Sequence, residues 1–194
     1  MRKQIANLTS NIFNPFLIGL ALILLVSFEA TASVFDALKW SLILITLSIL
    51  PTFLFAIYLV RRNKLDSILA NVRKQRTKLY ALAVILVGIN CIILLSLKAP
   101  LILLALSVAG FSVSVVFMCV NLRWKISLHT AFITGAVTVL FILYGFMSMA
   151  SIVLIPLVAW ARIELGSHSL AQIVAGALLA TSILVVVFYL FGLI

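Results

Sequence analysis

Two histidines beside basic residues carry the chemistry that this sequence offers. His129 and His168 are the only histidines of the chain; Lys125 precedes the first by four positions and Arg162 precedes the second by six. Imidazole transfers protons near neutral pH and also acts as a nucleophile, and the planar guanidinium group of arginine binds phosphate oxygens. These residue types predict a reaction on an anion, in which one histidine attacks and the other transfers a proton.

Carboxylates are too few to favour other chemistry. The chain has four, at Glu29, Asp36, Asp66 and Glu164, whereas a magnesium or two-metal centre needs several converging oxygen ligands. The Gly-x-Ser-x-Gly turn of serine hydrolases does not occur. We therefore expect no metal site and no cofactor, and we expect Glu164 to form an ordinary ion pair with a nearby cation.

The composition places these residues in a membrane protein. With 65% hydrophobic residues, 9% charged residues and a mean hydropathy of +1.36, the chain cannot cover itself with a polar surface. A membrane-spanning helix needs roughly 20 apolar residues, and the sequence predicts an all-α bundle of six to seven such helices. The candidate ranges are 12–28, 40–60, 79–97, 100–120, 128–147, 150–161 and 169–193. We expect the fifth and sixth to form a tight helical hairpin around residues 147–150, with a re-entrant segment as the alternative.

Basic residues cluster in one loop of the chain. Seven of the 14 lysines and arginines fall within residues 61–78, and short basic loops tend to stay on the cytoplasmic side of a membrane. Counting helices from this loop brings His129 and His168 to the same face. We expect an inner, cytoplasmic membrane with the active face toward the cytoplasm. Membrane lipids are the expected partners and nucleic acid is not, because the basic residues lie in short loops flush with the bilayer.

Three segments together resemble the signature motifs of the type-2 phosphatidic acid phosphatase family. The third motif, Ser-Arg, five residues, His, three residues and Asp, stands here as Ala161-Arg162, then His168, then Gln172 in place of Asp. The second, Pro-Ser-Gly-His, stands as Ile126-Ser127-Leu128-His129. In the first, Arg76-Thr77 fills the Arg-Pro position and Leu69 stands where lysine is expected. The resemblance covers roughly residues 61–180 and rests on order, spacing and topology together.

The resemblance implies a role for each matched residue. His168 would attack phosphorus to form a phosphohistidine, and His129 would protonate the leaving oxygen. Gln172, one helical turn after His168, would orient that imidazole through its carbonyl oxygen. The residues expected to bind the phosphate oxygens of the substrate are Arg76, Lys125, Ser127 and Arg162. Lys125, Lys74 or Lys78 would replace the lysine that is missing from the first motif.

The sequence thus predicts a metal-independent membrane phosphatase acting on a phosphate monoester or pyrophosphate of a lipid. Residues 1–60 would supply N-terminal membrane helices and residues 61–194 the phosphatase-like core. Candidate substrates are phosphatidic acid, a polyprenyl phosphate or pyrophosphate, and a lipid-linked sugar phosphate. A non-catalytic protein of the same fold that binds lipid headgroups or assists assembly is the alternative. A small transporter is a third reading, disfavoured because the predicted spans hold almost no ionisable residue near the membrane centre.

Overall fold

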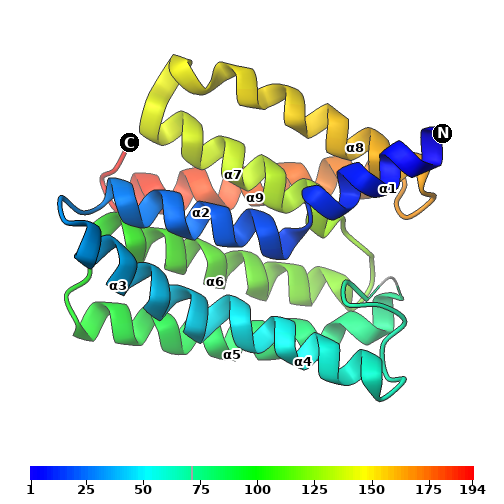
Figure 1. The fold of residues 1–194 in the computed structure, drawn as a ribbon, viewed down its shortest axis with the longest axis horizontal. Helices are drawn as coiled ribbons and strands as arrows, with labels where there is room; N and C mark the ends of the chain where they lie inside the picture. Colours follow the sequence, from blue (N-terminus) through cyan, green and yellow to red (C-terminus); the bar gives the residue numbers. More distant parts are fainter. Residues whose placement is uncertain (71) are drawn as a thin grey trace.

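The computed structural model describes residues 1–70 and 72–194, which form a bundle of helices without a strand among them (Figure 1). The helices, in chain order, are α1 (Arg2–Ile12), α2 (Pro15–Glu29), α3 (Val34–Leu44), the π-helix η1 (Ile45–Ile49), α4 (Leu50–Arg61), α5 (Arg73–Ser96), α6 (Leu101–Asn121), α7 (Leu128–Tyr144), the 3₁₀ segment η2 (Gly145–Val153), α8 (Leu154–Glu164) and α9 (Leu170–Leu190).

Several of the described helices are long and apolar enough to cross a membrane. Five helical segments meet this test by length and hydropathy, or six when the bent pair α1 and α2 counts as one span. Many large apolar side chains on their outer faces are exposed, as expected where lipid tails replace water as the solvent. The chain is therefore an all-α polytopic membrane protein, as the sequence predicts.

The N-terminal helix was not among the predicted spans. α1 and α2 meet at an angle of 41°, and the break has a local cause. Asn14 caps α2, its side chain accepting a hydrogen bond from the backbone N–H of Leu17 at 3.0 Å, and Pro15 occupies the first helical position. Proline fits there because its missing N–H has no partner in a helix start. α1 consequently leaves the line of α2 and packs along α8.

The predicted hairpin of the fifth and sixth helices is confirmed. α7 ends at Gly145, whose φ of +56° is a left-handed conformation that favours glycine. The chain then turns through η2, and α8 runs back beside α7 (Figure 1). As a result, His129 at the start of α7 and Arg162 near the end of α8 reach the same residue, Ser10 of α1.

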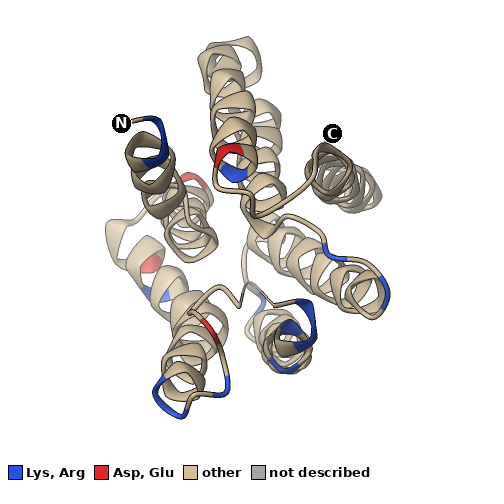
Figure 2. Ribbon diagram, turned by 90° about the vertical axis from the view of Figure 1, so that its right-hand side faces the viewer, with Lys and Arg blue, Asp and Glu red and all other residues tan. Residues whose placement is uncertain are grey.

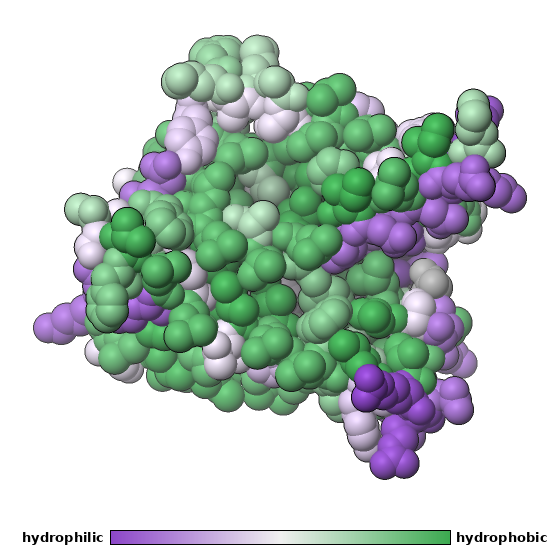
Figure 3. All heavy atoms as spheres, in the orientation of Figure 1, coloured by the Kyte–Doolittle hydropathy of each residue, from purple (hydrophilic) through white to green (hydrophobic). Residues whose placement is uncertain are grey.

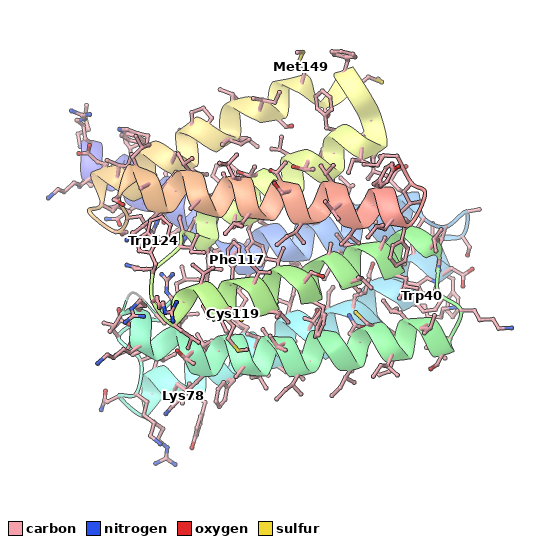
Figure 4. The ribbon with its side chains drawn as sticks, turned by 180° about the vertical axis from the view of Figure 1, so that it is seen from behind. Trp40, Lys78, Phe117, Cys119, Trp124 and Met149 are labelled. Atoms are coloured by element: carbon pink, nitrogen blue, oxygen red, sulfur yellow. The ribbon has the colours of Figure 1, made fainter. Side chains whose placement is uncertain are left out.

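Charge is concentrated at one end of the bundle. Figure 2, which faces this end, shows Lys and Arg on its loops and helix ends, whereas the side of the bundle is largely apolar between the two ends (Figure 3). Trp124 and Lys78 lie at the charged end and Trp40 lies toward the other (Figure 4). The N-terminus belongs to the charged end and the C-terminus to the opposite one. We call the charged end the basic end.

Candidate functional site

The loops that carry the predicted motifs meet at the basic end. Arg76 Nη1 donates to the carbonyl oxygen of Ile126 at 2.8 Å, and Lys125 Nζ donates to that of Ser167 at 2.9 Å. These two bonds join α5 to the loop before α7, and that loop to the loop before α9. The prediction that the three segments share one face, made from helix parity alone, is confirmed.

His168 is held with one ring nitrogen free. Its Nδ1 lies 3.0 Å from Gln172 Oε1, and the same oxygen accepts the backbone N–H of Ser169 at 3.3 Å. Because this carbonyl oxygen can only accept, Nδ1 carries the proton and Nε2 carries the lone pair. Nε2 is buried without a hydrogen-bond partner among the described residues. The imidazole is therefore in the tautomer that a nucleophilic Nε2 requires.

Gln172 owes its position to the start of α9. Ser169 is the N-cap, its hydroxyl accepting the backbone N–H of Gln172 at 3.4 Å, while the Gln172 side chain reaches back to the Ser169 N–H. This reciprocal pair is a capping box. The residue that replaces the expected aspartate thus both starts the helix and fixes the ring of His168.

Ser10 of α1 joins the two other predicted residues. Arg162 Nη1 donates to Ser10 Oγ at 2.6 Å. His129 Nε2 lies 3.2 Å from both Ser10 Oγ and the Ser10 carbonyl oxygen, and the carbonyl contact requires a proton on Nε2. The hydroxyl oxygen of Ser10 therefore occupies a point that one arginine and one histidine contact together.

Sequence reasoning missed Ser10. No motif includes it, but a signal was present, since the polar residues Asn7, Ser10, Asn11 and Asn14 follow the i, i+3, i+4, i+7 spacing of one helix face. All four line a polar pocket at the basic end, together with Arg162 and Ser167. This spacing indicates a helix face turned toward water or a ligand.

Five basic side chains share this region, and we call them the basic cluster: Arg76, Lys125, His129, Arg162 and His168. Four of them are almost fully buried, with exposed fractions of 3% for Arg76, 2% for His129, 5% for Arg162 and 7% for His168. Arg162 Nε has no hydrogen-bond partner among the described residues.

The charge of the basic cluster is only partly compensated. The ion pairs found in the described chain join Arg2 to Glu164 at 3.5 Å and Lys39 to Asp36 at 3.0 Å. The expected ion pair of Glu164 is thus confirmed, and neither pair includes a residue of the basic cluster. Asp66 offsets part of the charge felt by Arg76 and Lys125. Burying cations is costly unless they are paired, so the cluster favours an anionic ligand.

The pKa values in the loops show the same imbalance. Burial, followed by the charges of Lys125, Arg76 and Arg162, lowers the pKa of His168 to about 3. Burial and the two arginines also lower the pKa of Lys125. His168 is therefore neutral at pH 7, and its Nε2 lone pair is available for attack.

Two further motif positions, Ser127 and Leu69, contribute little to the charge of the site. Ser127, expected to bind substrate, caps α7 by accepting the backbone N–H of Thr130 at 3.4 Å, which leaves only its hydroxyl proton to donate. Leu69, in the position of the expected lysine, lines the polar pocket near the site but brings no charge. Of the three lysines considered as replacements, Lys125 is the one whose charge acts on His168.

Gly176 allows the motif-bearing segments to approach each other. Ser127 N–H donates to the carbonyl oxygen of Gln172 at 3.2 Å, and a Cβ on Gly176 would lie 2.7 Å from the carbonyl oxygen of Ser127. Only glycine permits this contact between α9 and the start of α7 without a shift of the backbone. The spacing between His129 and His168 depends on it.

Within the described residues, no three His, Cys, Asp or Glu side chains gather as a metal-binding group. Comparisons of the chain with protein-family models, curated proteins and solved structures found no match.

Proposed function

We propose that this membrane protein is a phosphatase that hydrolyses a phosphate monoester or pyrophosphate of a lipid through a phosphohistidine at His168. One observation carries the proposal. A buried imidazole has its Nδ1 proton held by Gln172 and lies among two buried arginines and a lysine. Among the described residues its Nε2 has no hydrogen-bond partner, and these three cations form no ion pair with a carboxylate. Such a site combines a nucleophile with an anion-binding pocket.

In the first step, the Nε2 lone pair of His168 would form a bond to phosphorus while the bond from phosphorus to the lipid oxygen breaks. His129, protonated in the complex with the phosphate dianion, would give its proton to the leaving oxygen. The contact geometry of Ser10 Oγ supports this role, because an oxygen at that point lies within reach of both His129 and Arg162. The guanidinium groups would balance the charge on the phosphoryl oxygens.

In the second step, a water molecule would attack the phosphohistidine and pass its proton to His129. The N–P bond breaks, inorganic phosphate leaves, and both histidines return to their starting states. Gln172 would keep the His168 ring oriented through both steps, although an amide stabilises the positive charge of the phosphorylated ring less than a carboxylate would.

The experiment is phosphate release by purified protein in detergent from a panel of lipid phosphates, with EDTA present. We expect release that vanadate inhibits competitively, and an acid-labile phosphoenzyme that His168→Ala abolishes. His129→Ala should slow turnover and leave substrate binding largely intact. Wild-type rates in His168→Ala, or an EDTA inhibition that Mg²⁺ reverses, would overturn the proposal.

Gln172 in place of aspartate favours a second candidate, a non-catalytic protein that binds phosphorylated headgroups. This candidate predicts no phosphate release from any lipid of the panel, together with retained binding of those lipids. The membrane in question would be the inner, cytoplasmic one in both cases, with the basic end toward the cytoplasm.

A further inference from the structure

An apolar cavity of about 280 Å³ lies inside the bundle, below the basic cluster. It is lined by residues of α2, α3, η1, α4, α5, α6, α7 and α9, and Arg76 and Tyr80 line its end nearest the basic end. Phe16 and Leu69 line both this cavity and the polar pocket that holds Arg162. The cavity and the pocket therefore share a wall, with Arg76 on the side of the cavity and Arg162 on the side of the pocket.

The cavity follows α5 away from the basic end. Asn90 lies 14 residues beyond Arg76 on the same helix and also lines the cavity, which at 1.5 Å per residue is a separation of about 21 Å. An elongated space of this length, with a cation at one end and apolar walls along it, matches an amphiphile whose anionic group is at one terminus.

The volume of the cavity corresponds to one hydrocarbon chain. An engineered cavity of about 150 Å³ accepts benzene, with its six carbons, so about 280 Å³ corresponds to roughly a dozen carbons. That amount accommodates a large part of one hydrocarbon chain. The two chains of a diacyl lipid would need at least twice the space.

Asn90 limits how deep an apolar chain can reach. Its side chain is 1% exposed, and Oδ1 has no hydrogen-bond partner among the described residues. A chain that passed this oxygen would seal it away from any partner, which is costly, whereas a chain that ends above it leaves room for a water molecule.

We propose that this cavity holds the hydrocarbon chain of a single-chain phosphate lipid, a monoalkyl or isoprenyl phosphate, whose phosphate lies in the basic cluster. The inference deepens the proposed function by naming the substrate class. The binding itself does not require catalysis, so the two can be tested separately.

Gly110 of α6 offers a way to shorten the cavity. It lines the cavity, and a Cβ added there would have only Val87 Cγ1 within 4 Å, at 3.8 Å. Gly110→Leu would therefore fill the space level with Val87, about 16 Å beyond Arg76 along α5. Cys119→Leu is the matched control, because Cys119 is an exposed residue of the same helix.

The binding experiment uses radiolabelled dodecylphosphonate, whose C–P bond is not hydrolysed, with butylphosphonate as a short competitor, on purified protein in detergent. We expect dodecylphosphonate to bind more tightly than butylphosphonate. Gly110→Leu should weaken the binding of dodecylphosphonate by at least about tenfold, because apolar burial is lost, and should leave the binding of butylphosphonate unchanged. Cys119→Leu should bind both ligands as the wild type does. If Gly110→Leu does not fold, Gly110→Ala should give a smaller loss in the same direction.

Phosphate release from dodecyl phosphate, butyl phosphate and didodecanoyl phosphatidic acid separates the two proposals. Chain-dependent binding without turnover keeps the cavity assignment and overturns the phosphatase. Turnover that favours the two-chain lipid, or a preference for dodecyl phosphate over butyl phosphate that Gly110→Leu leaves unchanged, keeps the phosphatase and overturns the cavity assignment.

Discussion

Replacing Gln172 with glutamate would place a carboxylate where an amide oxygen now orients the proposed nucleophile. Glutamate has the length of glutamine, so one oxygen can still accept both the His168 Nδ1 proton and the Ser169 backbone N–H that Gln172 Oε1 accepts at 3.0 and 3.3 Å. The capping box is kept, because glutamate is a favoured residue at this position. The substitution therefore changes the charge beside the ring and little else.

The magnitude follows from the contact distance. With 3.0 Å between Nδ1 and Oε1, the charge centres of a carboxylate and an imidazolium would lie about 4 Å apart, an interaction of about 4 kcal/mol at an effective dielectric constant of about 20. At about 1.4 kcal/mol per factor of ten, the ceiling is about a 10³-fold gain in the step that charges the ring. We expect kcat to rise by between about tenfold and this ceiling. KM should also rise, because the new charge repels the phosphate.

The assay is single-turnover phosphoenzyme formation and phosphate release in detergent, with Gln172→Asp as the control. Aspartate carries the same charge on a side chain shorter by one carbon, so it cannot keep both contacts and should give a smaller gain. A folded, substrate-binding Gln172→Glu that is slower than wild type would refute the orienting role and indicate that the amide N–H₂ group acts on the phosphate. No activity in either variant, with binding retained, would favour the non-catalytic candidate.

Three further predictions concern the surroundings of His168. Ser10→Ala should lower the free energy of unfolding in detergent by about 1–3 kcal/mol, since Arg162 loses its hydroxyl partner. Added phosphate should restore part of this loss. An unchanged free energy of unfolding would count against the contact between Ser10 and Arg162. Gly176→Ala should lower the free energy of unfolding by about 1–3 kcal/mol, and should lower kcat, because the added Cβ forces α9 away from α7. Gly110→Ala, where the added Cβ has open space, should not lower the free energy of unfolding. Equal effects of the two substitutions would refute the close-approach role of Gly176. Because the folded pKa of His168 is lowered to about 3, the unfolded chain takes up its proton first as pH falls below about 6.5, so this histidine alone should lower the free energy of unfolding by at most about 1.4 kcal/mol per pH unit down to about pH 3. His168→Asn should reduce that slope in pH-dependent unfolding, and an unaltered slope would contradict the lowered pKa.

Much of the site was predictable because helix geometry is local. The four-residue spacing of His168 and Gln172 places them on one helix face, and the count of apolar segments brings Arg162 and His129 to one end. Ser10 was less accessible, because its contact depends on a bend between α1 and α2 whose angle no spacing rule gives. The predicted span 12–28 begins at this bend, so the helix that carries Ser10 lay outside it.

The apolar cavity had no counterpart in the sequence. Its walls come from eight separate helical segments, and whether they leave space between them depends on how closely those helices pack. A pattern of apolar residues is the same for a filled core and for a hollow one. Arg76, Leu69 and Leu128, which line it, connect it with the positions that the motifs single out.

The shared use of Gln172 has an evolutionary consequence. Its carbonyl oxygen serves both the start of α9 and the ring of His168, so a lineage that had lost catalysis would still retain glutamine to keep the helix. His168 has no comparable structural obligation at Nε2, which is buried and has no hydrogen-bond partner in the part of the chain that the structure describes. Relaxed selection would therefore erase the histidine before the glutamine, and descendants that keep Gln172 while varying at position 168 would mark the branch in which turnover was abandoned.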